Sequence, residues 1–218
     1  APTTIKRIAE HTGFRFRETA DHFEAQSAKH AIVGVGSSLR ETAVSLTKIA
    51  NDIRWLGSGP RCGIGEILVP AVQPGSSIMP GKVNPVMAES LLQAAAQVMG
   101  NDTTIALGGM AGNFELNVMM PVMTHNLLQS IEILSSTSKA FGRDCVDGIR
   151  ANRERCGELI DRSLALVTAL SPVLGYDTAA AVAKEAYEHG KTLRRVVLDR
   201  GLMSPEEVDR ALDPGSMV

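Results

Sequence analysis

The stretch AKHAIVGVGSSLRETAVSLTKIANDIRWL, residues 28–56, decides the fold of this chain. Its apolar residues recur at steps of three and four, which is the period of one face of an α-helix. Asp21 and Glu24 precede the stretch as a capping box, and residues 57–60 follow it as a Gly/Pro stop signal. We predict one amphipathic helix from this cap to Leu56, about 50 Å long. Such a stripe needs partner helices to bury it, so the pattern predicts a long-helix bundle.

Two more long helices are expected to complete the bundle. Asn84 suits the N-cap and Pro85 the first helical position of a second helix, which should run past Gly100. A third helix is predicted to begin near Asn117 and to continue towards Phe141. Between the first two helices the chain is rich in Gly, Pro and Ser, which indicates a surface loop.

Beyond about residue 150 the predicted elements become short. One helix is expected over residues 152–170. A second should run from an Asp177 cap to Gly190, and a third should follow the capping box that Ser204 opens. The sequence therefore predicts an all-α fold.

Two domains are expected within this fold. Residues 1–150 should form the central helical-bundle domain, which contains the loop 75–85. Residues 151–218 should form a small C-terminal helical domain. Aromatic residues are only 4% of the chain, so both cores should be built from aliphatic side chains, which suits helix packing.

Composition and charge exclude several classes of protein. The net charge is −2 with acids and bases interspersed, so no basic stripe is available for nucleic acid or for an anionic membrane. No apolar run approaches the ~18 residues that span a bilayer. Cys62, Cys145 and Cys156 are too widely spaced for a disulfide framework or a CxxC metal site, which favours a reducing, cytoplasmic setting. We expect no nucleic acid, membrane, metal or cofactor as partner.

The loop Gly-Ser-Ser-Ile-Met-Pro-Gly-Lys-Val-Asn-Pro, residues 75–85, has the composition of an anion site. Its glycines free the backbone to bend, its two serines offer hydroxyls, and Lys82 supplies a mobile cation. The helix expected after Pro85 would direct its positive end back at the loop. A serine beside that cation and dipole would have its oxyanion favoured, which makes it a base or a nucleophile.

Three plainer interpretations of this loop compete with the anion site. The first is a flexible Gly/Ser linker, although a linker seldom ends in Lys-x-Asn-Pro before a helix. The second is a Walker-type phosphate loop, but five residues separate Gly75 from Gly81 where four are required, and Val83 replaces the Ser/Thr that holds magnesium. The third is that Asn84 is only an N-cap and Lys82 only a solvated charge.

This loop closely resembles the signature loop of the fumarase/aspartase superfamily. Other segments resemble class II fumarase in particular, and the resemblance extends over essentially the whole chain. They are Lys48–Leu56, Ser58–Glu66, Gly112–Val118 and Thr168-Ala-Leu. Aspartase is the nearest rival within the superfamily, but Arg61-Cys-Gly-Ile-Gly-Glu and His125-Asn-Leu-Leu-Gln-Ser are similar to fumarase.

The resemblance implies a role for each residue of the loop. Ser76 matches the catalytic base of the reversible hydration of fumarate to (S)-malate. Lys82 and Asn84 match residues that bind the substrate carboxylate, and Ser77 and Val83 match further substrate contacts. Glu89 matches a family glutamate that pairs with a histidine, although an acid near a helix start is also favourable by itself.

Other polar residues carry less specific signals. Asn113, Glu115 and Asn117 could border the site, but turn and N-cap duties explain them. His125 lies between apolar residues on a predicted helix, where a packed or surface histidine is the plainer interpretation.

The resemblance also implies partners that this chain lacks. A class II fumarase is about twice this length and is a homotetramer whose active site joins three subunits. The Ser/Thr-rich loop and the catalytic histidine lie upstream in the family, so we expect a missing N-terminal half, and the chain alone should be inactive. The alternatives are a non-catalytic fragment that assembles through its long helices, or an aspartate ammonia-lyase.

Overall fold

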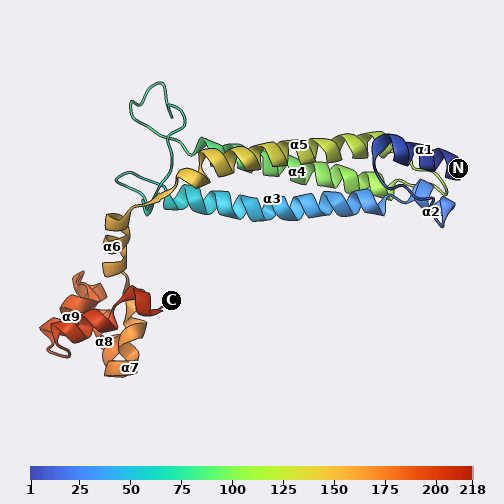
Figure 1. Ribbon diagram of the computed structural model, residues 1–218. Helices are drawn as coiled ribbons and strands as arrows, with labels where there is room; N and C mark the ends of the chain where they lie inside the picture. The colour runs from blue at the N-terminus through green and yellow to red at the C-terminus, as the bar shows by residue number, and fades with distance from the viewer. Residues whose placement is uncertain (218) are drawn as a thin grey trace. The chain divides into compact units, whose positions relative to one another are not determined.

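The computed structural model describes residues 1–217, and its regular secondary structure is helical except for two short strands (Figure 1), which confirms the predicted all-α class. The long helices are α3 (His30–Leu56), α4 (Val86–Met110) and α5 (Met120–Asp144). The shorter ones are α1 (Pro2–Thr12), α2 (His22–Ser27), α6 (Arg153–Asp161), α7 (Val167–Leu174), α8 (Tyr176–His189), α9 (Leu193–Asp199) and α10 (Pro205–Ala211). The 3-10 helices are η1 (Val146–Gly148), η2 (Leu164–Leu166) and η3 (Pro214–Met217), and the two strands are β1 (Ile67–Leu68) and β2 (Arg150–Ala151).

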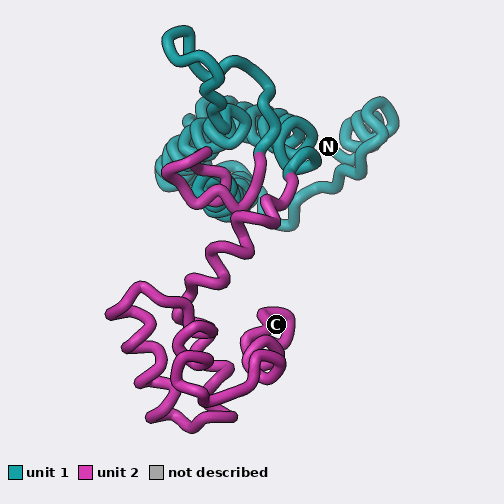
Figure 2. The backbone as a smooth tube through the Cα atoms, turned by 90° about the vertical axis from the view of Figure 1, so that its left-hand side faces the viewer, with its two compact units in different colours: residues 1–55, 69–149 teal, residues 56–68, 150–218 magenta. Residues whose placement is uncertain are grey.

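The chain divides into two compact units (Figure 2). Unit 1 comprises residues 1–55 and 69–149, and unit 2 comprises residues 56–68 and 150–218. Residues 56–68 therefore belong with the second unit, whereas the sequence analysis placed them in the bundle. They belong there because they pair with the segment that follows unit 1. Strand β1 is antiparallel to β2, and Asn152 and Arg155 donate hydrogen bonds to the carbonyls of Gly63, Ile64 and Gly65.

Unit 1 is the predicted long-helix bundle, in which α3, α4 and α5 lie side by side (Figure 1). Its core consists of small and aliphatic side chains with one aromatic ring, Phe141. Burial of the Cys145 thiol in this core raises its pKa. The small residues let the helices approach closely, since Ala43 and Ala50 of α3 are fully buried.

A polar layer crosses the bundle core. Asn101 of α4 donates to the hydroxyl of Ser130 at 3.0 Å and accepts from Gln97 at 2.9 Å. Asp102 is buried beside it and pairs one carboxylate oxygen with Arg40 of α3 at 3.1 Å. Buried polar groups of this kind tie neighbouring helices to one register, because a shifted helix would leave them unpaired.

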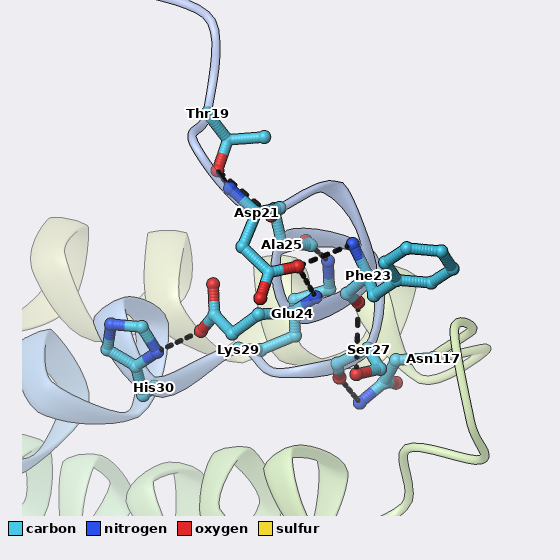
Figure 3. Close-up of polar contacts among 9 residues, drawn as sticks. All are labelled: Thr19, Asp21, Phe23, Glu24, Ala25, Ser27, Lys29, His30 and Asn117. Atoms are coloured by element: carbon cyan, nitrogen blue, oxygen red, sulfur yellow. Dashed lines mark hydrogen bonds and ion pairs between the residues drawn. The ribbon is translucent and has the colours of Figure 1, made fainter.

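The predicted single helix from the Asp21 cap to Leu56 is wrong at one point, because α2 ends at Ser27 and α3 begins at His30 (Figure 3). Asp21 caps α2 as predicted, accepting from the amides of Phe23 and Glu24. Glu24 does not return the bond; its carboxylate lies 2.9 Å from His30. Asn117 donates to the carbonyl of Ser27 at 3.3 Å, so a tertiary contact takes an acceptor at the end of α2.

The start of α4 also differs from the prediction. Pro85 is the N-cap and the helix begins at Val86, because the Asn84 side chain donates to the carbonyl of Gly75 instead of capping the helix. The helix runs past Gly100 as predicted. Helix α5 begins at Met120, three residues after the predicted start at Asn117.

Unit 2 contains more helices than the sequence analysis predicted. Where one helix was predicted over residues 152–170, the structure has α6, η2 and α7, and α7 continues to Leu174. The helix is interrupted because Ser163 caps a new turn by accepting from the amide of Ala165. Gly175, not Asp177, is the N-cap of α8, which ends at His189 with Gly190 as its C-cap, as predicted. Helix α9 was missed, although Thr192 caps it and Leu193, Val196 and Val197 bury one face.

The capping box at Ser204 is confirmed. The Ser204 hydroxyl accepts from the amide of Glu207 at 3.2 Å, and the Glu207 carboxylate accepts from the amide of Ser204 at 2.8 Å. The helices of unit 2 share an aliphatic core that includes Leu170, Val182, Val196 and Val208. Among residues 1–217, no helix is both long and apolar enough to cross a membrane.

Candidate functional site

The loop between β1 and α4 is closed by two hydrogen bonds between its own residues. The amide of Gly75 donates to the carbonyl of Lys82 at 2.9 Å, and the Asn84 side chain donates to the carbonyl of Gly75 at 2.8 Å. A Cβ on Gly75 would lie 2.6 Å from the Lys82 carbonyl oxygen and 2.9 Å from the Asn84 nitrogen. Only glycine therefore fits at this neck, where the two arms of the loop meet.

Ser76 is the first residue inside the neck, and its hydroxyl oxygen is held by two donors. The amides of Ile78 and Met79 both donate to Ser76 Oγ, each at 3.1 Å. Hydrogen bonds that point at an oxygen stabilise its charged form over its neutral form. The same bonds also make a tight serine turn, so the geometry serves the local fold as well.

The other loop residues proposed from the sequence face solvent or the neck. Ser77, Lys82 and Val83 are exposed, and Asn84 is half-buried. Gly81 has a φ of 78°, which a glycine adopts without strain and which lets the chain turn back towards the neck. The loop thus brings Ser76 and Asn84 to one neck and leaves Lys82 on the surface beside it, since the Lys82 carbonyl is bound at the neck.

Glu89 lies in the first turn of α4, directly after the loop. Its side chain is half-buried, and no hydrogen-bond or ion-pair partner for it lies within the part of the chain that the structure describes. An acid in the first turn is favoured by the helix dipole. The pairing with a histidine that the sequence analysis predicted stays a prediction.

The less specific candidates serve local structure or lie on the surface. Asn117 is buried and donates to the carbonyl of Gly108 at 3.0 Å, and Asn113 closes a turn with Leu116. Glu115 and His125 are exposed.

Comparison with known proteins shows which family the chain resembles. Residues 1–100 match a family model described as lyase, and residues 166–218 match one described as the fumarase C C-terminus. A curated class II fumarate hydratase from Thermosynechococcus vestitus is 50% identical over 203 residues, which cover 93% of this chain and 44% of that protein. Over nearly its whole length, the chain is therefore similar to class II fumarases.

Solved structures agree with this similarity. A class II fumarase from Schistosoma mansoni superposes with a TM-score of 0.85 at 35% identity, over 97% of this chain and 46% of that one. A structure described as a fumarate lyase:delta crystallin from Brucella melitensis gives a TM-score of 0.94 at 43% identity, over 100% of this chain and 47% of that one. The chain therefore spans less than half the length of the relatives it matches.

Sequence reasoning missed the contact at the base of the loop. Val69 packs against the bundle core, and the ring of Pro70 lies against Gly148 of η1. A Cβ on Gly148 would be 2.5 Å from Cγ of Pro70. The two residues are far apart in sequence, so only the fold reveals that they touch.

Proposed function

We propose that the complete protein containing this chain is a class II fumarate hydratase, which converts fumarate and water reversibly to (S)-malate. The observation that carries this proposal is the loop 75–85 itself, in which a serine hydroxyl accepts two backbone N–H groups beside a lysine and a helix N-terminus. The similarity to class II fumarases supports the same reaction class.

In this proposal Ser76, in its ionised form, takes the C3 proton of malate. The electron pair of the C–H bond moves onto the adjacent carboxylate, giving a dianionic intermediate. The C2–O bond then breaks, a group from the remaining part of the protein donates a proton to the leaving hydroxyl, and water and fumarate result. The two amides that donate to Ser76 Oγ support its role, because they stabilise the oxyanion that the first step requires.

Lys82 and Asn84 are proposed to bind the carboxylate on which the charge develops. The Lys82 ammonium is exposed and has no ion-pair partner among residues 1–217. One amide hydrogen of the Asn84 side chain is donated to the carbonyl of Gly75, and the other can be donated to a ligand. The positive end of α4 supports the same site. Ser77 and Val83 are proposed as further substrate contacts.

The proposal includes groups outside this chain. Glu89 is proposed to pair with a histidine from the remaining part of the protein, and the active enzyme is proposed to be a homotetramer assembled through its long helices. The exposed positions of α4 support an assembly surface, because none of them is charged. They are Ser90, Gln93, Ala96, Gln97, Gly100, Thr103, Leu107 and Met110. A reducing, cytoplasmic setting also stays a prediction.

A direct assay tests the proposed reaction. The purified complete protein should hydrate fumarate to (S)-malate and should not release ammonia from aspartate. The 218-residue chain alone should do neither. Ammonia release without hydration would replace the proposal by an aspartate ammonia-lyase, and activity in neither assay by the complete protein would support a non-catalytic assembly role.

A further inference from the structure

We propose that Gly148 is a positioning residue for the loop 75–85, acting through its contact with Pro70. The inference rests on the proposed function, because it concerns how the serine of that loop is held. Gly148 touches neither the loop nor a substrate position; it lies in η1, after the C-terminal end of α5.

The path of the chain into the loop shows where its position is set. Val69 packs against the core of unit 1, and the ring of the next residue, Pro70, contacts Gly148. Residues 71–74 take part in no hydrogen bond or ion pair within the described residues 1–217. The next fixed point is the neck at Gly75. Residues 71–74 are also exposed, so Pro70 is the last packed residue before the loop on its upstream side.

Gly148 is itself firmly held. Its amide donates to the carbonyl of Cys145 at 3.2 Å, and Cys145 is buried in the bundle core. Because the φ of Gly148 is not positive, its backbone tolerates an L-residue and the need for glycine is steric. A Cβ added at Gly148 would lie 2.5 Å from Pro70 Cγ. Because Gly148 is bonded to the buried Cys145 and cannot easily retreat, the added methyl group must displace Pro70.

The neighbouring glycine Gly142 supplies a matched control. It lies at the C-terminal end of α5, and a Cβ there would meet no atom within 4 Å. Gly142→Ala therefore adds the same methyl group to the same region without pushing on Pro70. A difference in loop exchange between the two variants therefore reports the contact of Pro70 with Gly148 and not the loss of a glycine.

Hydrogen exchange of the loop amides tests the proposal in the complete protein. The reporters are the amides of Gly75, Ile78, Met79 and Lys82, all of which are hydrogen-bonded inside the loop. Gly148→Ala should speed their exchange by about tenfold or more, while the amides of α4 and α5 keep their protection. Gly142→Ala should leave the loop amides unchanged.

A second pair of variants keeps the test decisive if Gly148→Ala disturbs the whole bundle. Pro70→Ala adds no atom, and it should loosen the same four amides because it removes the ring from Gly148. Combining Gly148→Ala with Pro70→Ala should bring exchange back towards wild type, since the new methyl group fills the space of the ring. Unchanged loop exchange in both single variants, or no recovery in the double variant, would overturn the proposal.

An activity measurement separates this inference from the proposed reaction. If the loop carries the base, Gly148→Ala should lower turnover on the order of tenfold to a hundredfold, and the double variant should recover it. Faster loop exchange with unchanged turnover would contradict the catalytic role of the loop and leave the positioning role of Gly148 standing.

Discussion

At Gly75 the two arms of the loop meet more closely than any side chain allows. The amide of Gly75 is bonded to the Lys82 carbonyl, and the Asn84 side chain closes the neck from the other direction. Ser76 follows directly, so the geometry around its hydroxyl depends on the neck being closed. Gly81 acts differently, through its φ of 78°, since a Cβ there would meet no atom within 4 Å.

Gly75→Ala should therefore damage activity more than Gly81→Ala. The methyl group at Gly75 must open the neck, and a shift of this size near the reacting groups costs on the order of a hundredfold in turnover. Ala at Gly81 only strains the backbone, by about 1–2 kcal/mol. Steady-state kinetics of both variants of the complete enzyme check this, and equal or greater loss in Gly81→Ala would contradict it.

Individual residues were predictable where a local pattern defines them. The serine pair, Lys82 and the glycines of the loop stand within one short segment, so the sequence shows them together. The contact between Pro70 and Gly148 joins distant segments, and no local pattern encodes it. Asn84 was predicted as a helix cap because its local context fits one, but its side chain donates a longer-range hydrogen bond to Gly75 instead.

The helices themselves show the same division between local and tertiary causes. Apolar periodicity and capping residues located the three long helices and the start of α10. The break between α2 and α3 depends on Asn117, which takes the Ser27 carbonyl from another part of unit 1. A Cβ on Gly112 would also lie 2.9 Å from that carbonyl oxygen, so the approach is close. Periodicity alone could not place this break.

The capping box of α10 makes part of unit 2 sensitive to acid. The Ser204 amide and hydroxyl hold the pKa of Glu207 below its ordinary value, and Arg194 does the same for the pKa of Asp209. Because both folded-state pKa values are lowered, the stabilisation is present above the ordinary carboxylate pKa, about 4, and is lost as the pH falls through the folded-state values.

Ser204→Ala should lower the melting temperature of unit 2 by roughly 4–8 °C at pH 7, because it removes the cap. The difference from wild type should shrink as the pH falls through the lowered folded-state pKa of Glu207, because the charge that the cap stabilises is then lost in both proteins. Thermal melts of the wild type and of Ser204→Ala at pH 7 and pH 3 check this. A difference that grows as the pH falls would show that the sign of the linkage is wrong.

For the molecule as a whole, the informative feature is a long helix with an uncharged exposed face. The charged residues of α4 are Glu89, which is half-buried, and Asp102, which is buried. Leu107 and Met110 are 59% and 80% exposed on the same helix. Uncharged, partly apolar helix faces of this length are typical of surfaces that another chain covers.

Leu107→Lys should weaken the proposed tetramer, because it places a charge on this face. Tyr187→Lys is a suitable control, since Tyr187 is also exposed but lies on α8 in unit 2. Light scattering of the complete protein should give a tetramer for wild type and for the control, and smaller species for Leu107→Lys. A monomeric wild-type protein at micromolar concentration would contradict the assembly.

The central claim is that Ser76 is the base of a fumarate hydratase, and comparing two adjacent serines tests it most directly. Ser76→Ala and Ser77→Ala each remove one hydroxyl from the same loop, but only Ser76 Oγ accepts the amides of Ile78 and Met79. In the complete enzyme, Ser76→Ala should reduce the kcat for fumarate hydration by several orders of magnitude with a smaller effect on KM, because a transition-state interaction is lost. Ser77→Ala should be milder. Equal activity of the two variants, or a greater loss in Ser77→Ala, would contradict the assignment.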